Sequence, residues 1–185
     1  EMLAEHGITF TILAPHQAGR VKKIEENKWL NVKGGKIDPQ RVYLCKLPSG
    51  KSIHVFFYDG PISHELAFKD LLRDGKMFAE RLTGVFPQEP DHDASPRLVH
   101  AATDGETYGH HKNFGDMALA FCLHHIESHQ LAKVTIYGEY LEKFPATHEV
   151  QILEDTSWSC AHGVERWRSD CGCRIGSHPG WHQKW

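Results

Sequence analysis

One pattern recurs in the sequence and limits the folds that the chain can adopt: a short apolar run stops abruptly at a cluster of polar residues. The runs cover residues 8–14 (ITFTILA), 53–58 (IHVFFY) and 98–103 (LVHAAT). Runs of this length and composition are typical of strands, and the third is continuous enough to be covered on both faces. Because helical patterns alternate with strands along the chain, we expect βα units in a barrel or an open parallel sheet.

The third run leads into a dense polar cluster, DGETYGHH at residues 104–111. Residues that follow such a strand lie at its carboxyl end, where α/β sheets and barrels hold their chemistry. The two glycines allow a sharp turn or the close approach of a ligand. We therefore interpret the cluster as an active-site loop. The alternative is that Asp104 and Glu106 only cap the following helix and favour its positive end.

The other two runs also deliver polar residues to their ends. Pro15, His16 and Gln17 follow the first run and form a second candidate site loop, and Asp59 opens a polar turn after the second. Ser63 is expected to cap the helix after that turn. Further expectations are a hairpin over 42–58, an ambiguous amphipathic stretch at 22–32, a helix broken near Gly75, a polar loop at 87–96, a helix over 113–129 with a largely buried middle, and strands at 134–137 and 148–153.

Composition excludes several classes of protein. The 185-residue chain is 40 % hydrophobic and 24 % charged, which is ordinary for a soluble globular domain. A net charge of −3 gives no reason to expect a nucleic acid or an anionic membrane as partner. No apolar run is long enough to span a bilayer and no signal peptide is visible. Five cysteines are an odd number, so we expect a reduced, cytoplasmic chain. Its ends, at Glu1 and Trp185, resemble those of a fragment.

The cluster DGETYGHH resembles a motif of glycoside hydrolase family 57, in particular of an uncharacterised bacterial branch of that family. GITFTILAPHQ and VFFYDGPISHELAF resemble further segments of the family in the same order, and TSWSCAHGVERWRSDCGC resembles a signature of the uncharacterised branch. The resemblance implies an α/β fold that is part of an incomplete (β/α)7-type barrel of the glycoside hydrolase and deacetylase kind. On this basis residues 1–153 form a partial catalytic domain, and residues 154–185 continue it as a Cys-, Trp- and His-rich segment.

The resemblance also implies a retaining mechanism on α-glucans, for which two carboxyl groups stand about 5–5.5 Å apart. Asp104 matches the acid/base of the family, and its pKa must be raised, which burial beside Glu106 would favour. No residue of this chain matches the nucleophile of the family, so we expect this polypeptide alone to be inactive. The residues expected to bind an oligo- or polysaccharide are His16, Gln17, Asp59, Glu106, Tyr108, His110, His111 and Trp158.

The C-terminal segment allows several interpretations. Cys160 and His162, with Cys171 and Cys173, are close enough in sequence to form a four-ligand zinc site, although the C-x-H and C-x-C spacings are unusual. Reduced thiols beside a substrate cleft, or ordinary buried small residues, are alternatives. We assign no metal or cofactor from the sequence. The ERWR stretch at 165–168 is either a binding surface or a solvated loop with one ring turned inward.

Two other functions compete with the glycosidase. In a metal-dependent polysaccharide deacetylase, Asp104, His110 and His16 would bind a divalent cation that activates water. The H-x3-H pair that such an enzyme uses does not stand near the 104–111 loop. In a non-catalytic carbohydrate-binding relative, the fold would persist without the nucleophile.

Overall fold

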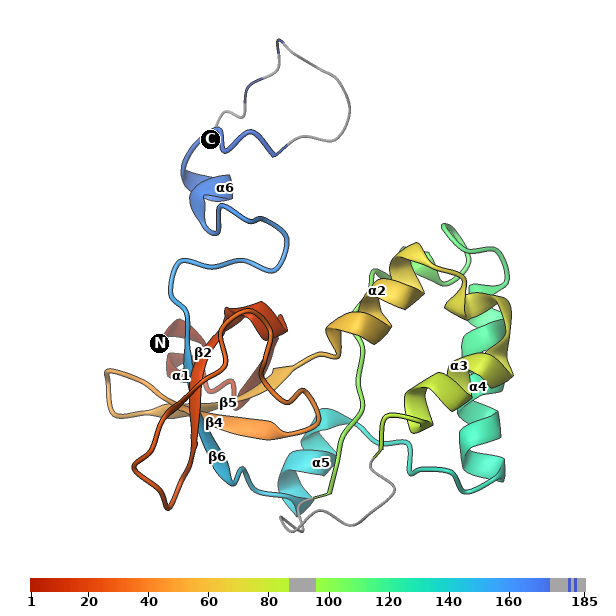
Figure 1. Cartoon of the computed structure of the whole chain (residues 1–185), viewed down its shortest axis with the longest axis horizontal. Coiled ribbons are helices and arrows are strands. Elements are labelled where there is room, and N and C mark those ends of the chain that lie inside the picture. Colours follow the sequence, from red (N-terminus) through yellow and green to blue (C-terminus); the bar gives the residue numbers. More distant parts are fainter. Residues whose placement is uncertain (87–95, 174–179, 181, 183–185) are drawn as a thin grey trace.

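The structure is a computed structural model and describes residues 1–86, 96–173, 180 and 182. Figure 1 shows a sheet beside a group of helices, with the chain after the last strand leading away to a short terminal helix. The described elements are α1 (Met2–Glu5), β1 (Phe10–Leu13), η1 (Pro15–Gln17), β2 (Ala18–Lys23), β3 (Leu30–Asn31), β4 (Val42–Lys46), β5 (Ser52–Phe57), α2 (Gly60–Phe68), η2 (Leu71–Arg73), α3 (Gly75–Thr83), η3 (Gly105–Thr107), α4 (Gly115–Ser128), α5 (Tyr137–Lys143), β6 (His148–Ile152) and α6 (Glu165–Arg168).

The six strands form one mixed sheet in the order β1-β5-β4-β6-β2-β3. β1 runs parallel to β5 and β4 runs parallel to β6, whereas the other neighbouring pairs are antiparallel. The α/β class predicted from the sequence is therefore confirmed. The sheet is not purely parallel, because β4 and β5 form the predicted hairpin around Gly50 and β2 and β3 occupy the ambiguous stretch.

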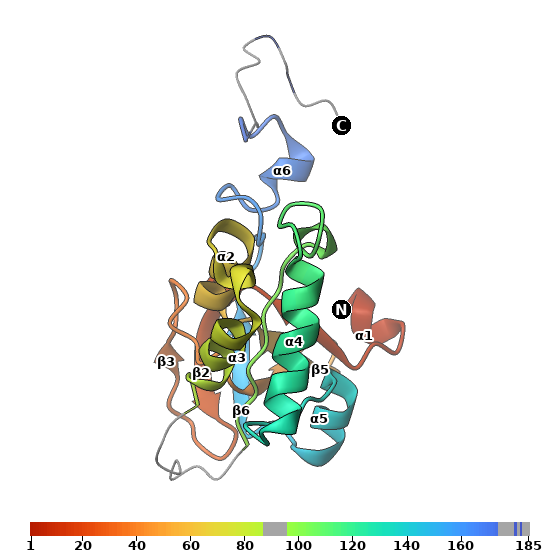
Figure 2. The ribbon, with the colours of Figure 1, turned by 90° about the vertical axis from the view of Figure 1, so that its right-hand side faces the viewer.

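Apolar side chains on the two faces of the sheet enter different cores. Phe57 and Val55 pack with Tyr43 and Val150 on one face, whereas Phe56 packs on the other face with Tyr140 of α5. A third core joins α2, α3 and α4, and Figure 2 shows α3 and α4 side by side. This alternation is what the period of two in a strand produces when both faces are covered. β5 is consequently the most enclosed strand, with four buried residues in its last five positions.

The third apolar run, residues 98–103, is not a strand in the structure. Its backbone groups bond to three separate places: Leu98 N to Gln40 O at 3.0 Å, His100 O to Asp59 N at 2.9 Å, and Ala102 N to the Ser63 hydroxyl at 3.0 Å. Because no single neighbour supplies consecutive partners, no ladder forms. The run is still covered by core on two sides, as its apolar pattern predicts, since Leu98 and Val99 pack into different clusters.

Three further expectations are wrong. Residues 134–137 form no strand, since Ile136 is the exposed N-cap of α5 and Tyr137 is already the first residue of that helix. The middle of α4 is not buried all round, since Met117, Phe121 and Leu123 are exposed while Ala118 and Cys122 face α3. The cap of α2 is Asp59 rather than Ser63.

Several other expectations are confirmed. The first strand, the hairpin, the helix break at Gly75 and the final strand at 148–152 are present. The polar loop predicted at 87–96 lies outside the described residues except for Pro96, as does part of the C-terminal segment. Within the described part of the chain, every helix is too short or too polar to cross a membrane.

Candidate functional site

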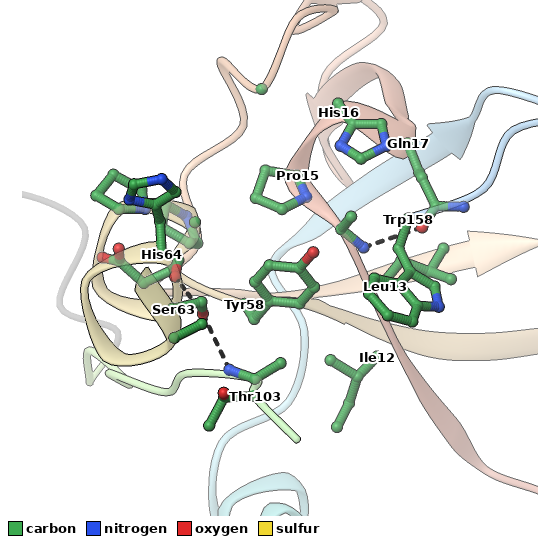
Figure 3. A pocket seen from close by; sticks show the side chains of 18 of the residues that line it. Ile12, Leu13, Pro15, His16, Gln17, Tyr58, Ser63, His64, Thr103 and Trp158 are labelled. Carbon is green, nitrogen blue, oxygen red and sulfur yellow. Dashed lines mark hydrogen bonds between the residues drawn. The ribbon is translucent and has the colours of Figure 1, made fainter. Parts of the chain in front are cut away.

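A cleft of about 1190 Å³ lies at the carboxyl ends of the parallel pair β1 and β5. Figure 3 shows side chains from η1, α2, the 98–104 segment and the chain after β6 converging on it. Of the residues predicted from the sequence as site residues, His16, Gln17, Asp59, Asp104 and Trp158 line this cleft. The cleft thus brings together residues from separate parts of the chain, and their roles in binding or catalysis stay predictions.

The η1 turn fixes the wall of the cleft that follows β1. Gln17 is buried, and its side-chain oxygen accepts a hydrogen bond from Ala14 N at 3.0 Å. Its backbone oxygen accepts a hydrogen bond from Leu153 N at 2.8 Å, which ties the turn to the end of β6. His16 is exposed, and its Nε2 donates to the carbonyl oxygen of Ser157 at 3.0 Å. The imidazole therefore links the end of β1 to the C-terminal segment.

Asp59 connects the end of β5 to α2. Its Oδ1 accepts a hydrogen bond from Ile62 N at 2.9 Å, which satisfies one of the free N–H groups at the helix start. The buried Ser63 donates its hydroxyl to Asp59 O at 2.6 Å and accepts a hydrogen bond from Ala102 N. Ser63 is thus the link that holds the 98–104 segment against α2.

Asp104 lies at the end of a segment that the side chain of His100 anchors. His100 is buried, its Nε2 donates to Pro39 O at 3.2 Å, and its Nδ1 accepts from the Tyr137 hydroxyl at 2.9 Å. These partners assign the neutral tautomer with the proton on Nε2. Burial lowers the pKa of His100 to about 4, so the anchor is uncharged at neutral pH.

The carboxylate of Asp104 is exposed at the start of η3 and makes no capping hydrogen bond there. The first residue of α4 follows Phe114, so neither Asp104 nor Glu106 caps that helix. Among the described residues, no hydrogen bond or ion pair holds the Asp104 side chain. The capping alternative therefore does not account for Asp104, which is exposed and lines the cleft.

The remaining predicted residues lie outside the cleft lining. Glu106, His110 and His111 form an exposed cluster of their own, in which His111 Nε2 lies 3.4 Å from Glu106 Oε2 and the two imidazoles stack at 4.8 Å. Tyr108 packs against the helical core, and burial raises the pKa of its hydroxyl. Their roles in substrate binding stay predictions, and Glu106 does not bury Asp104 as expected.

Sequence reasoning missed several lining residues. Tyr58, the last residue of the IHVFFY run, lies beside Asp59 at the cleft, and its place at a strand end was the signal that could have found it. His64 and Phe68 are one turn apart on α2, with ring centroids 5.2 Å apart, so helical spacing could have paired them. Trp167 of α6 also lines the cleft and is half exposed, which favours the binding-surface interpretation of ERWR.

Comparison with known proteins places the chain in one family. No curated protein matches the chain. A family profile described as Glycosyl hydrolase family 57 matches residues 1–153, which covers every described strand and all helices before α6. The match includes four of the five predicted residues in the cleft and excludes Trp158. The chain therefore belongs to glycosyl hydrolase family 57.

Proposed function

We propose that the cleft binds an α-glucan and belongs to a retaining glycosidase or glucanotransferase in which Asp104 is the acid/base. The observation that carries the proposal is that Asp104, an exposed residue whose side chain makes no capping hydrogen bond, lines a cleft at the ends of two parallel strands in a chain of a glycosyl hydrolase family. The finer fold assignment, part of a (β/α)7-type barrel, belongs to the same proposal. Membership of the family supports the proposed activity and the proposed barrel.

Sugar binding is proposed for the residues around that carboxylate. Trp158 is 66 % exposed, so its ring is free to stack against the apolar face of a pyranose. His16 has one ring nitrogen engaged with Ser157 O, which leaves Nδ1 for a sugar hydroxyl. Gln17 is buried with its amide satisfied, and it supports the wall rather than reaching far into the cleft. A ring stacked between Trp158 and the Asp104 wall would also exclude water from the carboxylate.

The nucleophile is proposed to lie outside this chain. Among the described lining residues the carboxylates are Asp59 and Asp104, and Asp59 already holds the start of α2 through Oδ1. A retaining enzyme needs a second carboxylate about 5–5.5 Å from the acid/base. A longer chain that carries a glutamate on the preceding barrel strand would meet that requirement.

The deacetylase alternative is less well supported by the arrangement. It requires Asp104, His110 and His16 around one cation, but His110 belongs to the exposed cluster with Glu106 and does not line the cleft. The proposed activity is therefore glycosyl transfer to water or to another sugar.

The acid/base role is tested in a longer chain that includes the nucleophile. Removing a general acid costs about 100- to 10,000-fold in rate, so Asp104→Asn should lose that much turnover on maltooligosaccharides. The same variant should still release fluoride from α-glucosyl fluoride in the first step, because that leaving group needs no proton, and azide, which needs no general base, should restore its turnover. Asp116→Asn, at an exposed position of α4 away from the cleft, is the matched control. Loss of fluoride release in the first step, no recovery with azide, or a wild-type rate on maltooligosaccharides would remove Asp104 from this role.

Binding is tested in the 185-residue chain itself. Titration calorimetry with maltoheptaose should detect binding without turnover. Trp158→Ala should weaken the affinity about tenfold, because one stacking contact contributes about 1.4 kcal/mol. Met117→Ala, which removes a similarly exposed apolar side chain on α4, should leave the affinity unchanged. Turnover by this chain alone would refute the external nucleophile.

A further inference from the structure

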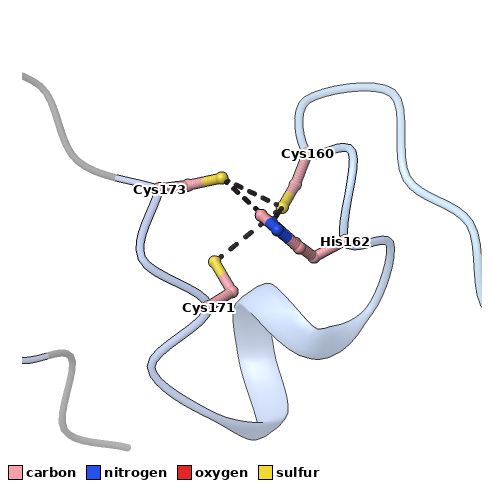
Figure 4. Close-up of side chains that lie close together, drawn as sticks. All are labelled: Cys160, His162, Cys171 and Cys173. Atoms are coloured by element: carbon pink, nitrogen blue, oxygen red, sulfur yellow. Dashed lines mark hydrogen bonds between the residues drawn. The ribbon is translucent and has the colours of Figure 1, made fainter.

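Four potential metal ligands converge in the C-terminal segment, away from the residues of the proposed acid/base chemistry. Cys160 Sγ lies 3.8 Å from Cys171 Sγ, 3.5 Å from Cys173 Sγ and 3.7 Å from His162 Nδ1. Cys173 Sγ lies 3.4 Å from the same nitrogen, and all four ligand atoms are within 4.8 Å of one another. Figure 4 shows the four side chains pointing toward one point from two loops joined by α6.

These separations fit one tetrahedral zinc ion. With Zn–S near 2.3 Å and Zn–N near 2.0–2.1 Å, a regular tetrahedron has S···S edges of about 3.8 Å and S···N edges of about 3.6 Å. The measured edges of 3.8, 3.5, 3.7 and 3.4 Å each lie close to those lengths. A disulfide would need sulfur atoms about 2.05 Å apart, and none of these cysteines forms one.

A second, independent observation is that the segment has almost no core of its own. Of residues 154–173, only Ser157, Cys160 and Gly163 are buried, and no apolar side chain larger than cysteine is buried among them. A short segment that buries so little surface needs a cross-link or a metal to hold one conformation. A close turn at Gly163, where φ is +63° and a side chain would overlap the Asp155 carbonyl, folds the first ligand loop back on residue 155.

We propose that Cys160, His162, Cys171 and Cys173 bind one zinc ion, and that this ion holds the segment carrying Trp158 and Trp167 against the cleft. Four protein ligands fill a tetrahedral zinc, so the ion has a structural role and no open position for chemistry. Trp158 lies two residues before the first ligand, and Trp167 lies between the second and the third. Both indoles line the cleft, and removing the ion releases both from that wall.

The metal is tested first, in the intact 185-residue chain purified under reducing conditions. Elemental analysis should find one zinc ion per chain, and Co²⁺ added to the metal-free chain should give the visible and thiolate charge-transfer absorption of a tetrahedral sulfur-rich site. His162→Ala and Cys173→Ser should each lose zinc to a chelator that the wild type resists. His129→Ala and Cys45→Ser, at a histidine and a cysteine outside the cluster, should bind zinc as the wild type does.

Absence of Co²⁺ binding by the reduced wild-type chain would overturn the site, even if the ligand variants fail to fold. Stoichiometric zinc in both ligand variants would overturn it as well, because the ion would then have other ligands. Circular dichroism of the metal-free chain serves as the folding control, since the sheet and its cores contain none of the four ligands.

The holding role is tested by hydrogen exchange with and without zinc, and it does not depend on the sugar assignment. Removal of zinc should raise amide exchange at least tenfold in residues 155–168, including the Trp167 amide that donates to Val164 O. Exchange in β1 and β5 should stay unchanged. Equal exchange in 155–168 with and without bound zinc would overturn the holding role.

Discussion

Acid should weaken the fold through one buried imidazole, that of His100. This side chain is 9 % exposed, packs edge-on against Phe56 and Tyr137, and has both ring nitrogens hydrogen-bonded. Burial lowers its pKa to about 4, and the Pro39 carbonyl and the Asp59 carboxylate offset only part of that effect. The unfolded chain, with an ordinary pKa near 6.5, takes up the proton at a pH where the folded chain still excludes it.

The sign and the size follow from that difference. Between pH 6.5 and pH 4 the unfolded state binds more protons than the native state, so the free energy of unfolding rises with pH and falls as the solution is acidified. With pKa values of 6.5 and about 4, the loss at pH 5 relative to pH 7.5 is about 2 kcal/mol for this group alone. Because the 98–104 segment depends on this anchor, acid should also release Asp104 from the cleft edge.

The assay is urea unfolding at pH 7.5 and at pH 5, followed by circular dichroism. His100→Gln keeps a donor for Pro39 O and an acceptor for Tyr137 but cannot be protonated, so its stability should fall about 2 kcal/mol less than that of the wild type between the two pH values. The exposed His129→Gln is the matched control and should follow the wild type. Acid sensitivity of His100→Gln equal to that of the wild type would refute the reasoning.

Three other substitutions test separate parts of the structure. Phe56→Ala removes a fully buried ring and should lower the free energy of unfolding by about 3–5 kcal/mol, whereas Phe68→Ala, at an exposed ring, should change it little in the same urea assay. Asp59→Ala should lower the free energy of unfolding by about 1 kcal/mol, because it removes the cap of α2. Asp59→Asn should keep most of that stability. An alanine variant as stable as the wild type would contradict the cap. Gly163→Ala should accelerate proteolysis of the C-terminal segment without shifting the urea midpoint. Gly172→Ala, at a position with open space around it, should accelerate proteolysis less. Equal digestion rates of the two variants would contradict the close turn.

Local signals in the sequence determined the elements that form from near neighbours. The hairpin at 42–58 follows from two β-rich arms around a Pro-Ser-Gly turn, and β1 and β6 follow from short β-branched runs. The same logic placed His16 and Asp59 at one cleft, because residues after strands collect at the carboxyl edge of a sheet. Asp104 lines the same cleft, although the run before it is not a strand. The order of residue types along the chain thus determined which side chains are available to a site.

Only the tertiary structure decided which partners those elements found. Residues 98–103 carry the pattern of a buried strand, yet their hydrogen bonds go to three different neighbours, a choice that no local pattern encodes. Tyr108 stands within the polar cluster but packs into the helical core, and Trp167 reaches the cleft from a separate helix. The four proposed zinc ligands have spacings that sequence alone leaves ambiguous, and their side chains meet through the fold of the chain around α6. Contacts between distant segments are set by packing and chain closure, whereas periodicity and turn residues act over a few positions.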